Sequence, residues 1–384
     1  MTHSISNCKR DFQAPCHAYL FENLLSKWAK YGISSEHGNS AENLTQDWQV
    51  NPMGRVRLLS QCRQLYTYSH AYLASQDEQW LNLLKPLYEF ILSNYLFEDD
   101  KVQRWRFSLD DELQPLDNSS DAYALAFVLL SFSFYYQASQ DESALIHIKH
   151  THGFLTQFMR ADTGGFYETY PIDKTQQRRQ NPHMHLLEGY IAAYNATLED
   201  VYKEEIIKLL DLAELHFFDA NSNSLIEFFT PDWQADKIDG HKIEPGHHFE
   251  WVWLLHQAYK IHPQQNYLTM ATRLWHKAFE FGFDPKGGIY NQIHAQTEKP
   301  LDTSKRIWPI TEFLKAACVQ LQNEDQAETI HKALNFMFEH YLNEDGRWHE
   351  YLDGENKVID ANLSGTTSYH IFLGLTEVLD WMQS

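Results

Sequence analysis

Two side chains with complementary proton chemistry stand three residues apart at the start of an apolar run. They are His247 and Glu250, in the segment Pro245-Gly-His-His-Phe-Glu-Trp-Val-Trp-Leu-Leu255. A Pro-Gly pair followed by an apolar run predicts the start of a helix, and residues three apart share one helix face. An imidazole exchanges protons near neutral pH, and a carboxylate beside it can orient it and tune its pKa. The pair therefore indicates acid–base chemistry.

Polar and aromatic residues recur at nearly constant intervals before and after this pair. The recurring positions are spaced by 60, 62, 62, 61 and 62 residues, and they are Arg63, Tyr123, His185, His247, Trp308 and His370. A single histidine on an apolar helix is ordinarily part of the core. Three histidines and one arginine at one phase of a repeat instead predict a polar pocket to which each repeat contributes. Glu188 follows His185 by three residues, among apolar neighbours where an unpaired carboxylate is costly.

The elements that must position these residues are predicted to be helices. Apolar residues at spacings of three and four indicate helices over 17–31, 55–75, 78–96, 120–138, 144–159, 183–196, 202–218, 247–261, 267–281, 304–322, 325–341 and 366–382. Acidic turns recur between them at Asp100, Asp162, Asp219, Asp284 and Asp345. Such a period is typical of a repeat architecture. We predict an all-α (α/α)6 barrel, six helical hairpins in a closed toroid with short β-ribbons in the loops, as a single catalytic domain over residues 1–384; an open superhelical stack fits the same period.

Composition excludes several classes of partner. The formal net charge of −21 argues against nucleic acid and anionic membranes. Residues 1–13 lack the apolar core of a signal peptide, and no apolar run is long enough to span a membrane. The four cysteines show no paired spacing, which is typical of free thiols in a reducing compartment. We expect a cytoplasmic protein that exists as a monomer or homodimer.

Metal and cofactor sites are not predicted. His183-x-His185 and His247-His248 suggest ligands, yet no helix carries a His-x-x-x-His pair and no cysteine cluster is present. The Gly-Gly pairs lie in the repeat turns, and no Gly-x-Ser-x-Gly elbow occurs. We therefore expect no metal and no cofactor.

At the recurring positions the chain resembles the N-acylglucosamine 2-epimerase superfamily. Five ordered motifs between about Arg55 and Leu379 carry the resemblance: Gln61-Cys-Arg63-Gln-Leu-Tyr-Thr-Tyr, Asn181-Pro-His-Met-His185-Leu-Leu-Glu188, Gly246-His247-His-Phe-Glu250-Trp, Lys305-Arg306-Ile-Trp308-Pro-Ile-Thr-Glu312 and Ser368-Tyr-His370. The family has an (α/α)6 barrel, and it contains 2-epimerases and aldose–ketose isomerases. The segment Val102–Leu130 is most similar to the mannose isomerase branch.

The resemblance implies a role for each motif residue. His370 would be the base that removes the C2 proton, and His247, oriented by Glu250, would serve ring opening and the oxygen protons. Arg63 would stabilise the negative oxygen, and Trp308 would stack on the sugar. The remaining residues would bind or position the sugar: His185, Glu188, Asn181, Tyr123, Arg306 and Glu312. A base of this kind predicts that activity falls as the pH drops through the imidazole range near 6.5.

The predicted function is interconversion of D-mannose and D-fructose through ring opening and a cis-enediolate, with a monosaccharide as the small-molecule partner. The alternative is a 2-epimerase of mannose and glucose or of a related sugar such as cellobiose, because both histidines serve either reaction. An (α/α)6 glycoside hydrolase, which needs two opposed carboxylates, and a non-catalytic sugar-binding protein are less favoured.

Overall fold

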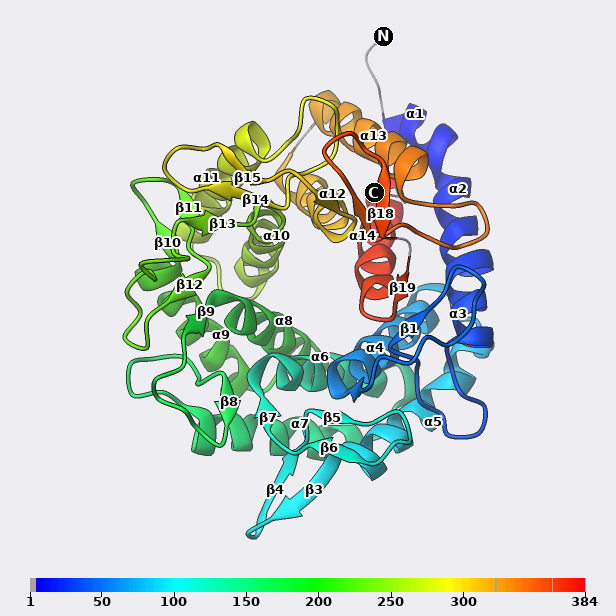
Figure 1. The fold of residues 1–384 in the computed structure, drawn as a ribbon, viewed down its shortest axis with the longest axis vertical. Coiled ribbons are helices and arrows are strands. Elements are labelled where there is room, and N and C mark those ends of the chain that lie inside the picture. The colour runs from blue at the N-terminus through cyan, green and yellow to red at the C-terminus, as the bar shows by residue number, and fades with distance from the viewer. Residues whose placement is uncertain (1–4, 322, 361, 384) are drawn as a thin grey trace.

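The inner layer of the molecule consists of helices arranged around one axis. The structure, a computed structural model, describes residues 5–321, 323–360 and 362–383. Figure 1 shows the inner helices around one axis: α4 (Leu58–Ser75), α6 (Ala122–Ser139), α8 (Gln180–Thr197), α10 (Pro245–Ile261), α12 (Trp308–Gln320) and α14 (Thr367–Gln383). Each contacts the next along the chain, and α14 contacts α4.

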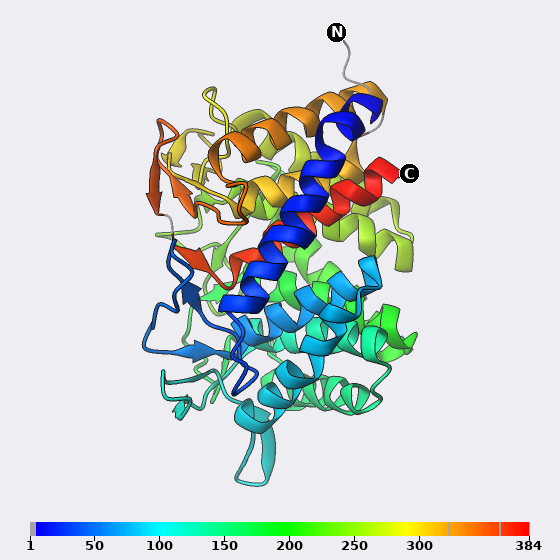
Figure 2. The same cartoon turned by 90° about the vertical axis from the view of Figure 1, so that its right-hand side faces the viewer.

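An outer layer surrounds the inner helices. Each outer helix packs on the inner helix that precedes it: α5 (Glu78–Tyr95), α7 (Ser143–Phe154), α9 (Asp200–Leu212), α11 (Gln265–Phe281) and α13 (Asn323–His340). Helix α7 continues as a π-helical stretch over Leu155–Met159, as α9 does over Ala213–Phe217. The N-terminal helical segment lies across α14 (Figure 2) and comprises α1 (Ile5–Cys8), α2 (Ala14–His17) and α3 (Leu25–Tyr31), joined by π-helical turns.

The two layers differ in how their side chains are distributed. Outer helix α11 buries one face, with Tyr267, Met270, Leu274 and Ala278 three or four residues apart, as expected of an amphipathic surface helix. Inner helices are covered on nearly every side. At Gly189 in α8 a Cβ would lie 2.6 Å from the carbonyl oxygen of Ala126 in α6, so a glycine is required for this close approach.

Short antiparallel ribbons connect the repeats, and Figure 2 shows those near both chain ends on one side of the molecule. The ladders are β1 (Asn43–Leu44) with β19 (Leu363–Ser364), β2 (Val56–Arg57) with β5 (Ser108–Leu109) and β5 with β6 (Pro115–Asp117), β3 (Leu96–Asp99) with β4 (Val102–Trp105), β7 (Ser120–Asp121) with β8 (Thr169–Tyr170), β9 (Arg178–Arg179) with β12 (Phe228–Phe229), β10 (Phe218–Asp219) with β11 (Ser224–Leu225), β13 (Lys242–Ile243) with β14 (Gln292–His294) and β14 with β15 (Pro300–Asp302), and β16 (Lys305–Arg306) with β17 (Tyr351–Leu352) and β17 with β18 (Val358–Asp360). Most of these pair the segment before one inner helix with a segment of a neighbouring repeat.

Two buried histidines fasten the acidic turns to the inner helices. The backbone N–H of Phe166 donates to His183 Nε2 at 3.0 Å, and that of Leu225 donates to His248 Nε2 at 3.1 Å. Each Nδ1 lies within 3.2 Å of a carbonyl oxygen four residues earlier. Both rings are thus neutral, burial lowers their pKa values to about 3 and about 4 respectively, and neither is available as a metal ligand.

The predicted helical fold is confirmed, and most helix ends lie within three residues of the predicted ones. The helix predicted from Ser304 begins instead at Trp308, because β15 and β16 occupy the preceding residues; its predicted end, residue 322, lies outside the described residues. In the described ranges no helix has the length and hydropathy needed to cross a membrane. The four cysteines are free thiols.

Candidate active site

A cavity of about 260 Å³ lies where the inner helices begin. It is lined by Arg57, Leu59, Arg63, Tyr123, Asn181, His185, Glu244, His247, Glu250, Arg306, Trp308, Thr366, Thr367 and His370. Nine predicted site residues are thereby brought together, whereas Glu188 and Glu312 do not line the cavity. Most of these nine residues belong to helices. Each of those lies within the first six residues of its helix.

His370 is held by a carboxylate from the neighbouring helix. Its Nδ1 lies 2.8 Å from Glu312 Oε1, and Glu312 is completely buried. Nδ1–H therefore donates to Glu312, which leaves Nε2 as an acceptor. Burial, followed by the charges of Arg63 and Lys315, lowers the pKa of His370 well below 6.5. Glu312 thus orients His370 and does not line the cavity, which corrects its predicted role. With its pKa lowered, His370 would gain a proton only well below pH 6.5, so the predicted fall in activity moves to lower pH.

His247 has the opposite protonation state. Its Nδ1 lies 3.0 Å from Glu227 Oε2 and 3.8 Å from Glu244 Oε2. Burial alone would lower the pKa of this imidazole, but the charges of Glu227 and Glu244 outweigh it and raise the pKa to about 10. His247 is therefore an imidazolium at neutral pH. The predicted orientation of His247 by Glu250 was wrong, because Glu227 makes that contact.

Glu227 belongs to a set of buried glutamates that repeats along the chain. Glu42 accepts from the backbone N–H and guanidinium of Arg57, and Glu168 accepts from the same groups of Arg179. These arginines directly precede α4 and α8, whereas Glu244 stands at that position before α10. Among the described residues no arginine side chain pairs with Glu227, whose Oε2 contacts His247 Nδ1 instead. Glu168 and Glu227 end two of the recurring acidic turns, and that shared position was the sequence signal for Glu227.

Glu250 faces His185 and not its own helix neighbour. His185 Nε2 lies 3.7 Å from Glu250 Oε1, and both residues are the sixth of their helices. His185 Nδ1 lies 3.0 Å from Glu188 Oε2, while Glu188 Oε1 accepts from the Tyr369 hydroxyl at 2.5 Å. Burial lowers the pKa of His185 to about 4. Burial, then the charge of Glu312, raises the pKa of Glu250 well above 4.5, which favours the protonated form of this carboxyl group. Glu188 thus orients His185 from beneath the cavity, which corrects its predicted role as a sugar ligand.

One group of side chains in the described part of the chain could hold a metal ion. Its members are His185, Glu188 and Glu250, whose ligand atoms lie within 4.8 Å of one another. The two carboxylates face different nitrogens of the imidazole. Glu188 is also engaged by Tyr369. Hydrogen bonds thus account for the contacts of Glu188 with His185 and Tyr369, and the absence of a metal stays a prediction.

Arg63 and Trp308 complete the wall between the histidines. Arg63 Nη1 donates to the Thr366 carbonyl at 3.0 Å and Nη2 to the Tyr123 hydroxyl at 2.8 Å. The Trp308 ring centroid lies 5.0 Å from that of His247 and 5.9 Å from that of His370. A Cβ at Gly246 would lie 2.5 Å from this indole, so the glycine before His247 leaves room for Trp308.

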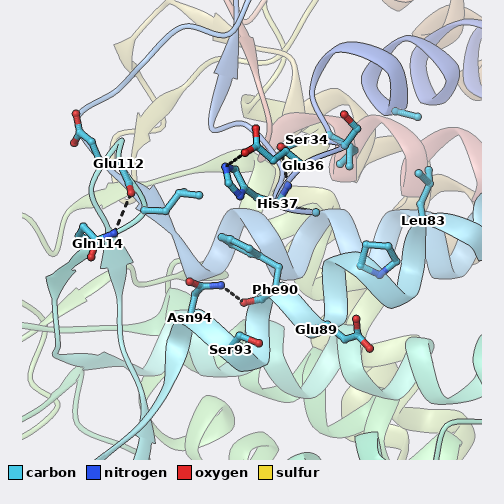
Figure 3. A pocket seen from close by; sticks show the side chains of 16 residues that line it. Ser34, Glu36, His37, Leu83, Glu89, Phe90, Ser93, Asn94, Glu112 and Gln114 are labelled. Carbon is cyan, nitrogen blue, oxygen red and sulfur yellow. Dashed lines mark hydrogen bonds and ion pairs between the residues drawn. The ribbon is translucent and has the colours of Figure 1, made fainter.

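A larger hollow of about 750 Å³ lies away from this site, between the Ser34–Gly38 loop, α5 and the Glu112–Gln114 turn (Figure 3). Its polar groups bond locally: Asn94 Nδ2 donates to the Phe90 carbonyl, and Gln114 Nε2 donates to the Glu112 carbonyl (Figure 3). Its side chains do not converge on one point, unlike those of the histidine cavity.

Comparison with known proteins agrees with this geometry. A sequence model of N-acylglucosamine 2-epimerase (GlcNAc 2-epimerase) matches residues 39–374. The chain belongs to the N-acylglucosamine 2-epimerase family.

Relatives in this family carry two kinds of activity. A D-mannose isomerase of Marinomonas mediterranea is 29% identical over 359 residues, covering 87% of this chain and 89% of the relative. A cellobiose 2-epimerase of Dictyoglomus turgidum is 23% identical over 339 residues, covering 83% of this chain and 84% of the relative. The structure of cellobiose 2-epimerase from Bacillus thermoamylovorans superposes with a TM-score of 0.87 at 21% identity, over 97% of this chain and 99% of the other. The protein is thus a carbohydrate isomerase in the broad sense that includes epimerases.

Proposed function

We propose that this protein is an aldose–ketose isomerase that interconverts D-mannose and D-fructose, on a closed (α/α)6 barrel formed by the whole chain as one domain. The observation that carries the proposal is the contrast between its two histidines. In one cavity His370 is neutral with Nε2 unprotonated, and His247 is an imidazolium. Environments that push two pKa values apart assign the base and the acid.

Ring opening comes first, because only the open-chain aldose has an acidic C2–H. It needs a proton at the ring oxygen and a group that takes the anomeric hydroxyl proton. Glu250 lines the cavity, and its raised pKa favours the acid form that supplies the proton to the ring oxygen. Neutral His185, whose Nε2 lies 3.7 Å from Glu250 Oε1, accepts the proton of the anomeric hydroxyl.

Isomerisation then moves one proton between carbons and one between oxygens. His370 Nε2 takes the C2 proton, and the C–H electron pair forms the C1–C2 double bond of a cis-enediolate. The negative charge develops on O1, which His247 protonates, while Arg63 supplies a fixed positive charge to the intermediate. His247 then takes the O2 proton, and His370 returns its proton to C1 to give the ketose.

The size and lining of the cavity support a single sugar ring as the substrate. Its volume of about 260 Å³ lies just below the ~300–1,000 Å³ of drug-sized pockets. Trp308 offers an indole between the two histidines. Nothing in this reaction calls for a cofactor, and we propose a cytoplasmic enzyme acting as a monomer or homodimer.

A 2-epimerase is the second candidate, and one observation favours it. Epimerisation returns the proton to the opposite face of C2, which requires a second donor. His247, protonated at neutral pH, is such a donor, and the Trp308 ring lies near both His247 and His370. D-Glucose would then be the product from D-mannose.

The test is incubation of the protein with D-mannose in deuterated water, followed by NMR of the products. Fructose deuterated at C1 supports the isomerase, and glucose deuterated at C2 supports the epimerase. A His370→Asn preparation controls for contaminating activity. Absence of both products with wild-type protein, while cellobiose or another sugar is converted, would overturn the mannose assignment.

A further inference from the structure

A lysine lies completely buried directly beneath the catalytic cavity. Lys315, on α12, is 0% exposed, and its Nζ lies 2.8 Å from Glu312 Oε2 and 4.3 Å from the centroid of the Trp253 ring. Glu312 uses its other oxygen, Oε1, to accept from His370 Nδ1. One carboxylate thus joins the buried ammonium to the catalytic imidazole.

Burying an ammonium ion is costly unless opposite charges surround it. Burial lowers the pKa of Lys315, but the charges of Glu312, Glu188 and Glu250 more than reverse this effect, so its pKa lies above 10.5. Glu377 of α14 also acts electrostatically with Lys315. Carboxylates of α8, α10, α12 and α14 therefore converge on one lysine.

Lys315 does not touch the substrate. Among the described residues it lines neither the cavity of His247 and His370 nor the cavity of about 210 Å³ that Glu188, Trp253 and Glu377 line. Any effect on the reaction must therefore pass through Glu312 or through its field at His370.

We propose that Lys315 is a positioning residue for the proton transfer at C2: its ammonium holds Glu312 Oε2, so that Oε1 stays in place to accept from His370 Nδ1–H and Nε2 stays free to take the proton. This rests on the function proposed above. Without Lys315, Glu312 would lose the ion pair that fixes its Oε2. A Glu312 side chain that turns away from His370 no longer accepts from Nδ1–H, and the imidazole proton is then free to move to Nε2, where it blocks the base.

The groups that face His370 from the elements around it bear on any pH effect. Those acting electrostatically are Arg63 of α4, His185 and Glu188 of α8, and Lys315 of α12, with Glu312 as the hydrogen-bond partner. Removing Lys315 removes one of two fixed positive charges that lower the pKa of His370. The pKa should therefore rise, and the acid limb of kcat/KM should move to higher pH.

The test is Lys315→Met, which keeps the unbranched chain against Trp253 and removes the charge. Selectively 15N-labelled histidine reports the tautomer of His370 by NMR, with assignment from His370→Asn. Wild-type protein should show Nε2 unprotonated, and Lys315→Met should show the proton on Nε2 or an imidazolium. This measurement needs no turnover, so it stands even if the mannose reaction fails.

Kinetics supply the second readout, on whichever sugar the wild-type protein converts. We expect kcat to fall roughly 10²-fold, as for a misoriented general base, with KM changed less than about threefold because Lys315 does not contact the sugar. In a protein that already carries Glu312→Gln, adding Lys315→Met should lower kcat by less than about a further threefold, because the two residues act as one unit.

Lys277→Met is the matched control. Lys277, on outer helix α11, is 5% exposed and pairs at 2.7 Å with the partly exposed Glu298, so its loss removes a buried ammonium and an ion pair that do not line the cavity. It should lower the melting temperature while leaving the His370 tautomer and the pH profile unchanged. A folded Lys315→Met protein that keeps the wild-type tautomer, or equal losses with and without Glu312→Gln, would overturn the proposal.

Discussion

Replacing Glu227 by glutamine tests the claim that His247 is a permanent acid. The raised pKa of His247, about 10 against 6.5, corresponds to roughly 5 kcal/mol in favour of the imidazolium at 1.36 kcal/mol per pH unit. Glutamine keeps an oxygen for Nδ1–H and for the amide of Gln180, which donates to Glu227 at 2.8 Å. The substitution therefore removes mainly charge.

The expected loss can be worked out from the two carboxylates. Glu244 remains 3.8 Å away, so we expect the pKa to fall by the one to three units typical of a single opposite charge, to about 7–9. An acid is active while protonated, so activity is lost as the pH rises through this value. At pH 9 wild type would be about 90% imidazolium, whereas a variant with a pKa of about 8 would keep about a tenth. Turnover should fall roughly ninefold at pH 9 and much less at pH 6.5.

The assay is turnover from pH 5 to 11 for wild type, Glu227→Gln and Glu168→Gln. Glu168 is the equivalent buried glutamate of another repeat, but it binds Arg179 at 2.7 Å. Replacing Glu168 should lower the stability of the fold and leave the basic limb of the turnover–pH profile near pH 10. If the basic limbs of Glu227→Gln and wild type coincide, His247 is not held protonated by Glu227.

Four further predictions follow from the same contacts. His370→Asn should fold, as judged by circular dichroism, and lose roughly 10²–10⁴-fold in turnover and in C2–H exchange with deuterated solvent; more than about a tenth of wild-type turnover would move the base elsewhere. The acid limb of wild-type kcat/KM should lie well below pH 6.5, because a base is lost only as pH falls through its lowered pKa; a midpoint at or above 6.5 would contradict this. Activity should survive dialysis against EDTA, and recovery that depends on one divalent ion would assign a metal to the pocket. Gly189→Ala should cost about 1–3 kcal/mol in urea unfolding by overpacking α6 against α8, whereas Gly153→Ala, with open space at its Cβ, should not destabilise; equal effects would refute the packing argument.

Periodicity predicted the helices and the cavity because both depend on local sequence. Apolar spacing identified each inner helix, and the recurring side chains all lie near helix starts, so they meet at one end of the ring. Their equal spacing did not mean equal depth. Tyr123 is the second residue of α6 and Arg63 the sixth of α4, and both still reach the cavity because six helical residues rise only about 9 Å.

Partners across helices could not be predicted in this way. A shared helix face made Glu250 the expected partner of His247, but the level of each residue in the ring decides the contact, and His185 stands level with Glu250. Glu188 and Glu312 were expected beside the sugar. Glu188 lies three residues further into α8 than His185, about 4.5 Å deeper, so it supports the cavity from below. Glu227 lies between β11 and β12, outside every helix, and carried no helical signal at all.

The pairing of the chain's two ends has a consequence for how the protein is made. Strand β1 pairs with β19, and Arg63 and Gln64 of α4 donate to Thr366 and Gly365, more than 300 residues away. Contacts of such sequence separation form late, after a large loss of chain entropy. Thr366 is synthesised 303 residues after Arg63, so a shorter nascent chain cannot hold Arg63 in place through this contact. If His370 is the base, as we propose, a growing polypeptide remains catalytically silent until α14 has docked against α4.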